Sequence, residues 1–196
     1  FVIGDMPFGT YNVSIEDAVK NANKLFMESG CDCIKLEGGS DVAPVIKAIV
    51  KAGIPVCAHI GLTPQSAAMM GGFKVQGKSL EAAQELLDSA RAVEEAGAFM
   101  VVLEGIPKML ADVITQKINI PTMGIGAGAG CDMQVLVAQD MLGMNEWVPK
   151  FAKKFADLHK VIIDAYNEFA KESNERTFPD EATQYNAKIE GIENLK

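Results

Sequence analysis

One short apolar stretch carries charges where a strand would bury them. Cys33–Gly39 (CIKLEGG) has the composition of a strand, yet Lys35 and Glu37 stand two positions apart within it. Because side chains alternate along a strand, Cys33, Lys35 and Glu37 share one face. A solvent-facing edge strand is one explanation. Helical segments on both sides favour the interior of a parallel sheet instead, where charges need an ionic partner or a metal.

Three other apolar segments end in polar side chains, namely Asp5, His59 and Glu104. Asp5 and Glu37 supply carboxylate oxygens, which suit Mg²⁺ together with water ligands, although a structural ion pair with Lys35 is the alternative. His59 is either a substrate ligand or a hydrogen-bonded core histidine. Glu104 is either a proton acceptor or a strand-end salt-bridge partner. Polar residues at successive strand ends are typical of a barrel active site.

The elements that must position these residues alternate between strands and helices. Three helical patterns end at a glycine (Gly30, Gly53 and Gly97) that is followed directly by a strand pattern, as in βα units. Ser14 and Ser79 are predicted to cap helices at their amino ends. We predict strands at 1–5, 33–37, 54–60, 98–104, 120–124 and near 147–149, and helices at 15–29, 41–52, 79–96, 108–117, 132–142 and 151–175.

Five clear βα units and one weaker unit predict an α/β fold with a parallel sheet. A (β/α)₈ TIM barrel takes about 250 residues, and this chain has 196 and begins in a strand pattern. We therefore expect a barrel that lacks its first two βα units, with residues 1–176 as its single domain and 177–196 as a tail. An open, doubly wound sheet is the alternative.

The bulk composition narrows the function classes. A net charge of −8 without a basic run disfavours nucleic acid and anionic membranes as partners. The spacing of the four cysteines suits neither a disulfide framework nor a zinc site, so we predict free thiols and a reducing, cytoplasmic compartment. The glycine run Gly124–Gly130 lacks the spacing of a dinucleotide fingerprint and predicts a tight turn with close backbone contacts.

Seven phrases together resemble the ketopantoate hydroxymethyltransferase (3-methyl-2-oxobutanoate hydroxymethyltransferase) family. They run in order along most of the chain, and the His59–Gly77 region is the most specific of them. The phrases are Asp5–Tyr11 (DMPFGTY), Ile34–Gly39 (IKLEGG), His59–Ser66 (HIGLTPQS), Gly71–Gly77 (GGFKVQG), Val102–Glu104 (VLE), Gly124–Gly128 (GIGAG) and Pro149–Phe151 (PKF).

This resemblance implies a TIM barrel that transfers a hydroxymethyl group from 5,10-methylenetetrahydrofolate to 3-methyl-2-oxobutanoate, giving 2-dehydropantoate for pantothenate and coenzyme A synthesis. It implies that Asp5 and Glu37 bind Mg²⁺, with Asp5 also near the keto acid. Lys35 would bind that substrate, Glu104 would take the proton from its C3 atom, and His59 would line the pocket. The resemblance also implies a homodecamer.

The family also uses a Gly-Asp-Ser phrase on an upstream strand, which this chain does not contain, so we expect the chain by itself to hold only part of the site. An alternative enzyme is a Mg²⁺-dependent lyase of the phosphoenolpyruvate mutase and isocitrate lyase type. Its signature is a cysteine in the loop that corresponds to 61–78, where this sequence has none. A barrel that serves only as an assembly subunit is the non-enzymatic alternative.

Overall fold

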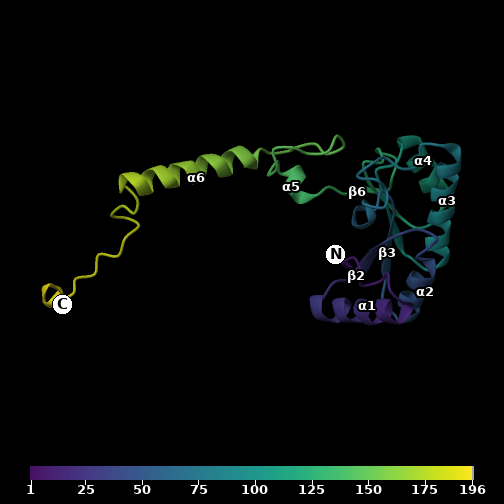
Figure 1. The fold of residues 1–196 in the computed structure, drawn as a ribbon, viewed down its shortest axis with the longest axis horizontal. Coiled ribbons are helices and arrows are strands. Elements are labelled where there is room, and N and C mark those ends of the chain that lie inside the picture. The colour runs from purple at the N-terminus through teal and green to yellow at the C-terminus, as the bar shows by residue number, and fades with distance from the viewer. Residues whose placement is uncertain (196) are drawn as a thin grey trace. The chain divides into compact units, whose positions relative to one another are not determined.

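The computed structural model describes residues 1–195, and the chain divides into two compact units, Phe1–Leu136 and Val137–Lys196. The first unit contains a six-stranded sheet with four long helices (Figure 1). Its strands are β1 (Ile3–Asp5), β2 (Cys33–Glu37), β3 (Val56–Gly61), β4 (Met100–Glu104), β5 (Thr122–Ile125) and β6 (Met133–Gln134). Its helices are α1 (Ile15–Ser29), α2 (Ala43–Lys51), α3 (Leu80–Glu95) and α4 (Lys108–Lys117), with a short 3₁₀ helix η1 (Pro64–Ser66) after β3.

The strands follow one another in the order β1-β2-β3-β4-β5-β6, and every neighbouring pair is parallel. Helices α1 to α4 lie side by side, each contacting the next (Figure 1). A doubly wound sheet would reverse its strand order at a switch point and carry helices on both faces. The alternative of an open, doubly wound sheet is therefore wrong for this part of the chain. The predicted parallel α/β class is confirmed.

The helix ends follow the local signals in the sequence. The Ser14 side chain accepts a hydrogen bond from the Asp17 backbone, and Ser79 accepts one from Ala82, so both predicted caps are present. Gly30 ends α1 in the left-handed conformation, with a φ of 68°. These caps need only residues within one turn, which explains why the sequence predicted them correctly.

The two faces of the sheet differ in what covers them. The face toward the helices packs Ile34, Leu36 and the matching residues of β3 and β4 against the apolar sides of α1 to α4. The opposite face carries a smaller cluster, which consists of Cys33, Cys57, Met100, Val102 and Ile125. Side chains alternate between the two faces along a strand, so Lys35 and Glu37 lie on the same face as Cys33, and His59 lies on the same face as Cys57. All three polar side chains are therefore on this second face.

The region after β5 differs from the prediction. Residues 132–142 are not one helix: Met133–Gln134 add a sixth strand, and only Ala138–Met141 (α5) are helical. The carboxylate of Asp132 accepts hydrogen bonds from the backbone N–H and the hydroxyl of Thr122, at 2.8 and 2.9 Å. These two bonds hold the chain beside β5, where β6 pairs, and so override the helical pattern.

Two further predictions in the second unit are also wrong. No strand forms at 147–149 within the described residues, and the long helix α6 spans Leu158–Glu175 instead of 151–175. A second 3₁₀ helix, η2 (Ile192–Asn194), follows near the end of the unit. The predicted domain boundary at residue 176 stays a prediction. Within residues 1–195, no helix combines the length and apolar character needed to cross a bilayer.

Gly61 is the last residue of β3, and its surroundings give a test of close packing at the carboxyl end of the strand. Its φ is +93°, and a Cβ there would collide with the backbone oxygen of Glu104 and with Ile106. We expect Gly61→Ala to lower the free energy of unfolding by about 3 kcal/mol in urea titration. Gly53 has the same φ class (+94°) with open space around it. The matched variant Gly53→Ala should therefore cost only about 1 kcal/mol, and equal losses would contradict the packing argument.

Candidate functional site

Polar side chains from four neighbouring strands gather at one end of the sheet. Asp5, Glu37 and Glu104 are the last residues of β1, β2 and β4, and His59 lies near the end of β3. The register places Asp5 opposite Lys35 and Glu37 opposite His59. Because all four strands are parallel, their carboxyl ends meet at the same edge. The structure thus brings all five predicted residues into one cluster.

Lys35 is the centre of one half of this cluster. Its ammonium nitrogen lies 2.8 Å from Oδ1 of Asp5 and 3.7 Å from Oε1 of Glu37. The Glu37 side chain is 4% exposed, whereas that of Asp5 is 53% exposed. One carboxylate is therefore sealed in the interior and the other is open to a ligand from solvent. The predicted interior orientation of Lys35 and Glu37 is confirmed, and the edge-strand explanation is wrong.

His59 lies between Glu104 and Glu37 and so links Glu104 to the residues around Lys35. Its Nε2 lies 2.9 Å from the carbonyl oxygen of Leu62 and 3.2 Å from Oε2 of Glu104. A carbonyl oxygen can only accept, so Nε2 carries the proton and donates. The other ring nitrogen, Nδ1, is buried without a hydrogen-bond partner among the described residues and faces Oε1 of Glu37 at 3.9 Å. An unpaired buried nitrogen at this position suits a ligand that donates a hydrogen bond.

Two residues that the sequence did not single out also belong to the cluster. The backbone N–H of Gln65 donates to Oε2 of Glu37 at 2.9 Å, and the Tyr11 hydroxyl donates to the Gln65 side chain at 2.7 Å. Burial raises the pKa of the Tyr11 phenol, which stays a neutral donor. Tyr11 lies in the segment after β1 and Gln65 in η1 after β3, and the sequence showed them only as members of the phrases Asp5–Tyr11 and His59–Ser66.

Two cysteine thiols on the same face of the sheet as the polar cluster are buried. Cys33 and Cys57 are fully buried, and burial raises the pKa of Cys33 to about 11 and that of Cys57 to about 12. All four cysteines are free and at least half-buried, as predicted. A buried thiol that stays protonated is a poor nucleophile, so these two cysteines are not candidates for a nucleophilic role.

The buried thiols make stability depend on pH in the alkaline range. Between pH 9.0 and about 11, both thiols ionise in the unfolded chain but stay protonated in the folded one. The unfolded state then binds fewer protons, so the unfolding free energy falls as pH rises. In urea titrations across this range, a Cys33→Ala/Cys57→Ala variant should lose stability less steeply than the wild type. Val102→Ala, in the same cluster, should keep the wild-type slope, and equal slopes for all three proteins would contradict the assignment.

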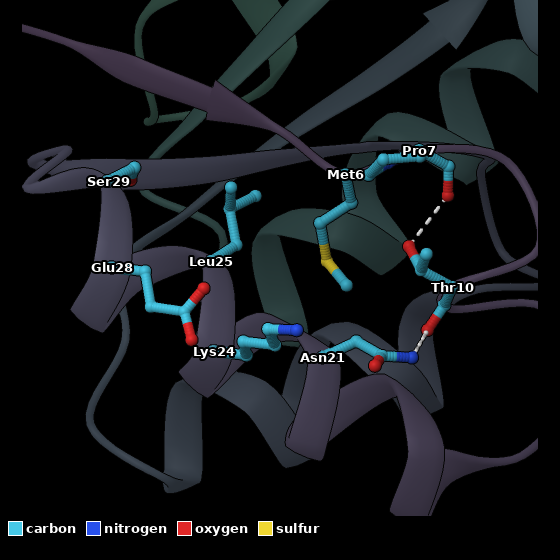
Figure 2. Close-up of a pocket in the computed structure, with 8 residues that line it drawn as sticks. All are labelled: Met6, Pro7, Thr10, Asn21, Lys24, Leu25, Glu28 and Ser29. Carbon is cyan, nitrogen blue, oxygen red and sulfur yellow. Dashed lines mark hydrogen bonds between the residues drawn. The ribbon is translucent and has the colours of Figure 1, made fainter.

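A cleft of about 450 Å³ lies between α1 and the loop after β1 (Figure 2). The Thr10 hydroxyl donates to the Pro7 carbonyl at 2.6 Å, and the Asn21 side chain donates to the Thr10 carbonyl at 2.8 Å. The lining residues are Met6, Pro7, Thr10, Asn21, Lys24, Leu25, Glu28 and Ser29. None of the five clustered residues lines this cleft, so we do not assign it to the site.

The glycine run Gly124–Gly130, which begins in β5, lets the backbone approach α4 closely. A Cβ on Gly128, whose φ is +81°, would lie 2.6 Å from the Lys108 side chain. The predicted tight turn with close contacts is confirmed.

Fold and site together define a parallel α/β protein with a carboxylate, lysine and histidine cluster at the carboxyl ends of its strands. A family model described as ketopantoate hydroxymethyltransferase matches residues 1–181. The chain therefore belongs to the ketopantoate hydroxymethyltransferase family, and the resemblance noted in the sequence is confirmed.

Curated relatives agree with the family match. The 3-methyl-2-oxobutanoate hydroxymethyltransferase of Clostridium novyi (strain NT) is 58% identical over 179 residues, which cover 91% of this chain and 65% of the relative. That of Heliobacterium modesticaldum is 55% identical with the same coverage, and that of Clostridioides difficile (strain 630) is 49% identical over 99% of this chain and 71% of its own. The chain thus spans 65% of the length of the first two relatives.

The donor set at the cluster fits a hard divalent cation. Among residues 1–195, no group of three or more His, Cys, Asp and Glu side chains could hold a metal ion by itself. Asp5 and Glu37 offer two carboxylates, both within reach of one ammonium group. Mg²⁺ commonly takes one or two carboxylates and completes its shell with water and substrate oxygens. The two carboxylates are therefore compatible with such an ion.

Proposed function

We propose that the natural protein transfers a hydroxymethyl group from 5,10-methylenetetrahydrofolate to 3-methyl-2-oxobutanoate, giving 2-dehydropantoate in pantothenate synthesis. The observation that supports this most is the juxtaposition of a general-base candidate, Glu104, with the Lys35–Asp5–Glu37 cluster through His59. Family membership favours this transferase over the phosphoenolpyruvate mutase-like lyase and over a purely structural subunit.

Asp5 and Glu37 would hold Mg²⁺, which when bound supplies positive charge for a developing enolate and orients the chelating keto acid. Lys35 would bind the same substrate through its ammonium group. The Lys35 ammonium lies between the two carboxylates, so it can turn one of its N–H groups to a substrate oxygen while staying paired with Asp5. This places a second positive charge beside the enolate oxygen.

Glu104 would remove the proton from C3 of the keto acid. The C–H bond breaks, its electron pair enters the enolate, and the proton passes to the carboxylate of Glu104. His59 Nε2, which donates to the Leu62 carbonyl, lies 3.2 Å from Oε2 of Glu104, so the imidazole flanks this carboxylate while the other carboxylate oxygen accepts the proton. The enolate carbon then forms the new bond to the methylene carbon of the folate, and the two carbon–nitrogen bonds of that methylene break. A water molecule supplies the hydroxyl group on this carbon, and its remaining proton and the C3 proton held by Glu104 pass to the two nitrogens of the departing tetrahydrofolate. The buried Nδ1 of His59 would line the pocket and accept a hydrogen bond from a ligand or water.

We also propose that the six strands are part of a (β/α)₈ barrel and that the natural protein is a homodecamer in a reducing, cytoplasmic compartment. The sequential parallel order and the row of neighbouring helices support the barrel. The free cysteines support the compartment. Light scattering of the natural protein tests the decamer.

Deuterium exchange tests the reaction itself. The natural protein is incubated with 3-methyl-2-oxobutanoate in D₂O, with and without Mg²⁺, and the C3 proton is followed by NMR. We expect exchange that depends on protein and Mg²⁺ even without folate, because proton removal precedes the transfer. Adding 5,10-methylenetetrahydrofolate should then give 2-dehydropantoate. Absence of both exchange and product would contradict the proposed function.

A further inference from the structure

One glutamine joins two segments at the carboxyl end of the sheet. Gln65 lies in η1, after β3, and is partly buried. Its side-chain amide nitrogen donates to the carbonyl oxygen of Met6 at 2.9 Å, and its amide oxygen accepts from the Tyr11 hydroxyl at 2.7 Å. The amide orientation is defined, because the Met6 carbonyl can only accept a hydrogen bond. The side chain therefore joins η1 to the segment after β1 at two points.

The same residues close a ring of hydrogen bonds around Glu37. The Gln65 backbone N–H donates to Oε2 of Glu37 at 2.9 Å. The backbone N–H of Glu37 donates in turn to the Tyr11 hydroxyl at 3.3 Å, and that hydroxyl donates to Gln65. Glu37 is thus tied at both its main chain and its carboxylate. Tyr11 is almost fully buried, so water does not compete for its hydroxyl.

This ring decides which oxygen of Glu37 remains for a ligand. Oε2 is used by Gln65, whereas Oε1 faces Lys35 at 3.7 Å and His59 Nδ1 at 3.9 Å. Neither Tyr11 nor Gln65 forms an ion pair or a hydrogen bond with Lys35, Asp5 or Glu104 within the described part of the chain. Among the described residues, their hydrogen bonds to the cluster run through Glu37 alone.

We propose that Gln65 and Tyr11 act as a pair of positioning residues, which hold the Glu37 carboxylate through Oε2 so that Oε1 would be left to bind a divalent cation. This inference rests on the proposed function, since it assumes that Glu37 binds the cation. Hydrogen-bonded partners of metal-binding carboxylates set the orientation of the ligand and so the affinity for the ion. Loss of the ring should weaken cation binding more than it weakens the fold.

The test measures cation binding directly on the natural full-length protein, with Mn²⁺ as an electron paramagnetic resonance probe and saturating 3-methyl-2-oxobutanoate. Gln65→Leu removes both side-chain bonds, and Tyr11→Phe removes the hydroxyl. We expect each variant to raise the Mn²⁺ dissociation constant about tenfold. The double variant should show no greater loss than the weaker-binding single variant, because both changes break one ring. Steady-state kinetics should show a higher Mg²⁺ requirement with a smaller change in kcat at saturating Mg²⁺.

Two controls separate positioning from general damage. Gln84→Leu, on the exposed face of α3, and Tyr185→Phe, exposed in the second unit, should leave Mn²⁺ affinity unchanged. Thermal unfolding of every variant is measured without metal. In Tyr11→Phe, hydrogen exchange of the Glu37 amide in the metal-free protein should also become faster, because that amide loses its acceptor.

The outcomes are distinguishable. Wild-type protein that binds neither Mn²⁺ nor the keto acid would overturn the proposed function, and the positioning role with it. Wild-type binding with unchanged affinity in Gln65→Leu and Tyr11→Phe would overturn the positioning role alone. Losses in both single variants that simply add in the double variant would also overturn it, because independent effects do not describe one ring.

Discussion

Replacing Glu104 by glutamine lowers the rate of C3 deuterium exchange in 3-methyl-2-oxobutanoate by about a thousandfold, in the range that general bases contribute. The amide keeps the size of the side chain and can still contact His59, but it cannot take up a proton at neutral pH. The Glu104 side chain is only 12% exposed, so water is poorly placed to replace it as the base. Binding of the keto acid, measured by calorimetry with Mg²⁺, should change little.

A matched substitution controls for the loss of one carboxylate. Glu95 is exposed at the end of α3, and Glu95→Gln should retain wild-type exchange. If Glu104→Gln exchanged the C3 proton at the wild-type rate, Glu104 would not be the base. If exchange and keto acid binding were lost together, Glu104 would serve binding instead of proton transfer.

Replacing Lys35 by methionine weakens keto acid binding by about ten- to a hundredfold, the range of one lost charge-assisted hydrogen bond. The same change should tighten Mg²⁺ binding in the absence of the keto acid. The Lys35 ammonium occupies the space between Asp5 and Glu37, and without it both carboxylates are free to attract another cation. Titration calorimetry with each ligand separately measures the two effects, which have opposite signs.

Lys108 provides the control for this change. It pairs with Asp112 at 2.8 Å, the same separation as Lys35 and Asp5, but on the exposed surface of α4. Lys108→Met should leave both binding constants unchanged, because exposed ion pairs contribute little. Weaker Mg²⁺ binding in Lys35→Met would show that the lysine supports the cation site instead of competing for it.

Most of the secondary structure of the first unit could be predicted because its signals are local. The caps Ser14 and Ser79 and the stop Gly30 depend on neighbours within one turn, so the sequence shows them directly. The region after β5 could not be predicted in this way. Asp132 bonds across ten residues to Thr122, and that contact, invisible in a local pattern, turns a predicted helix into an edge strand.

The sequence by itself determined the family, the parallel α/β class, and the shared face of Lys35 and Glu37, because alternation along a strand is a property of the backbone. Only the tertiary structure decided which partners meet. Strand register sets Asp5 beside Lys35 and Glu37 beside His59, and the folding of two loops brings Gln65 and Tyr11 to Glu37. These contacts join residues 22 to 30 positions apart, so they follow from the packing of helices and strands and from no local pattern.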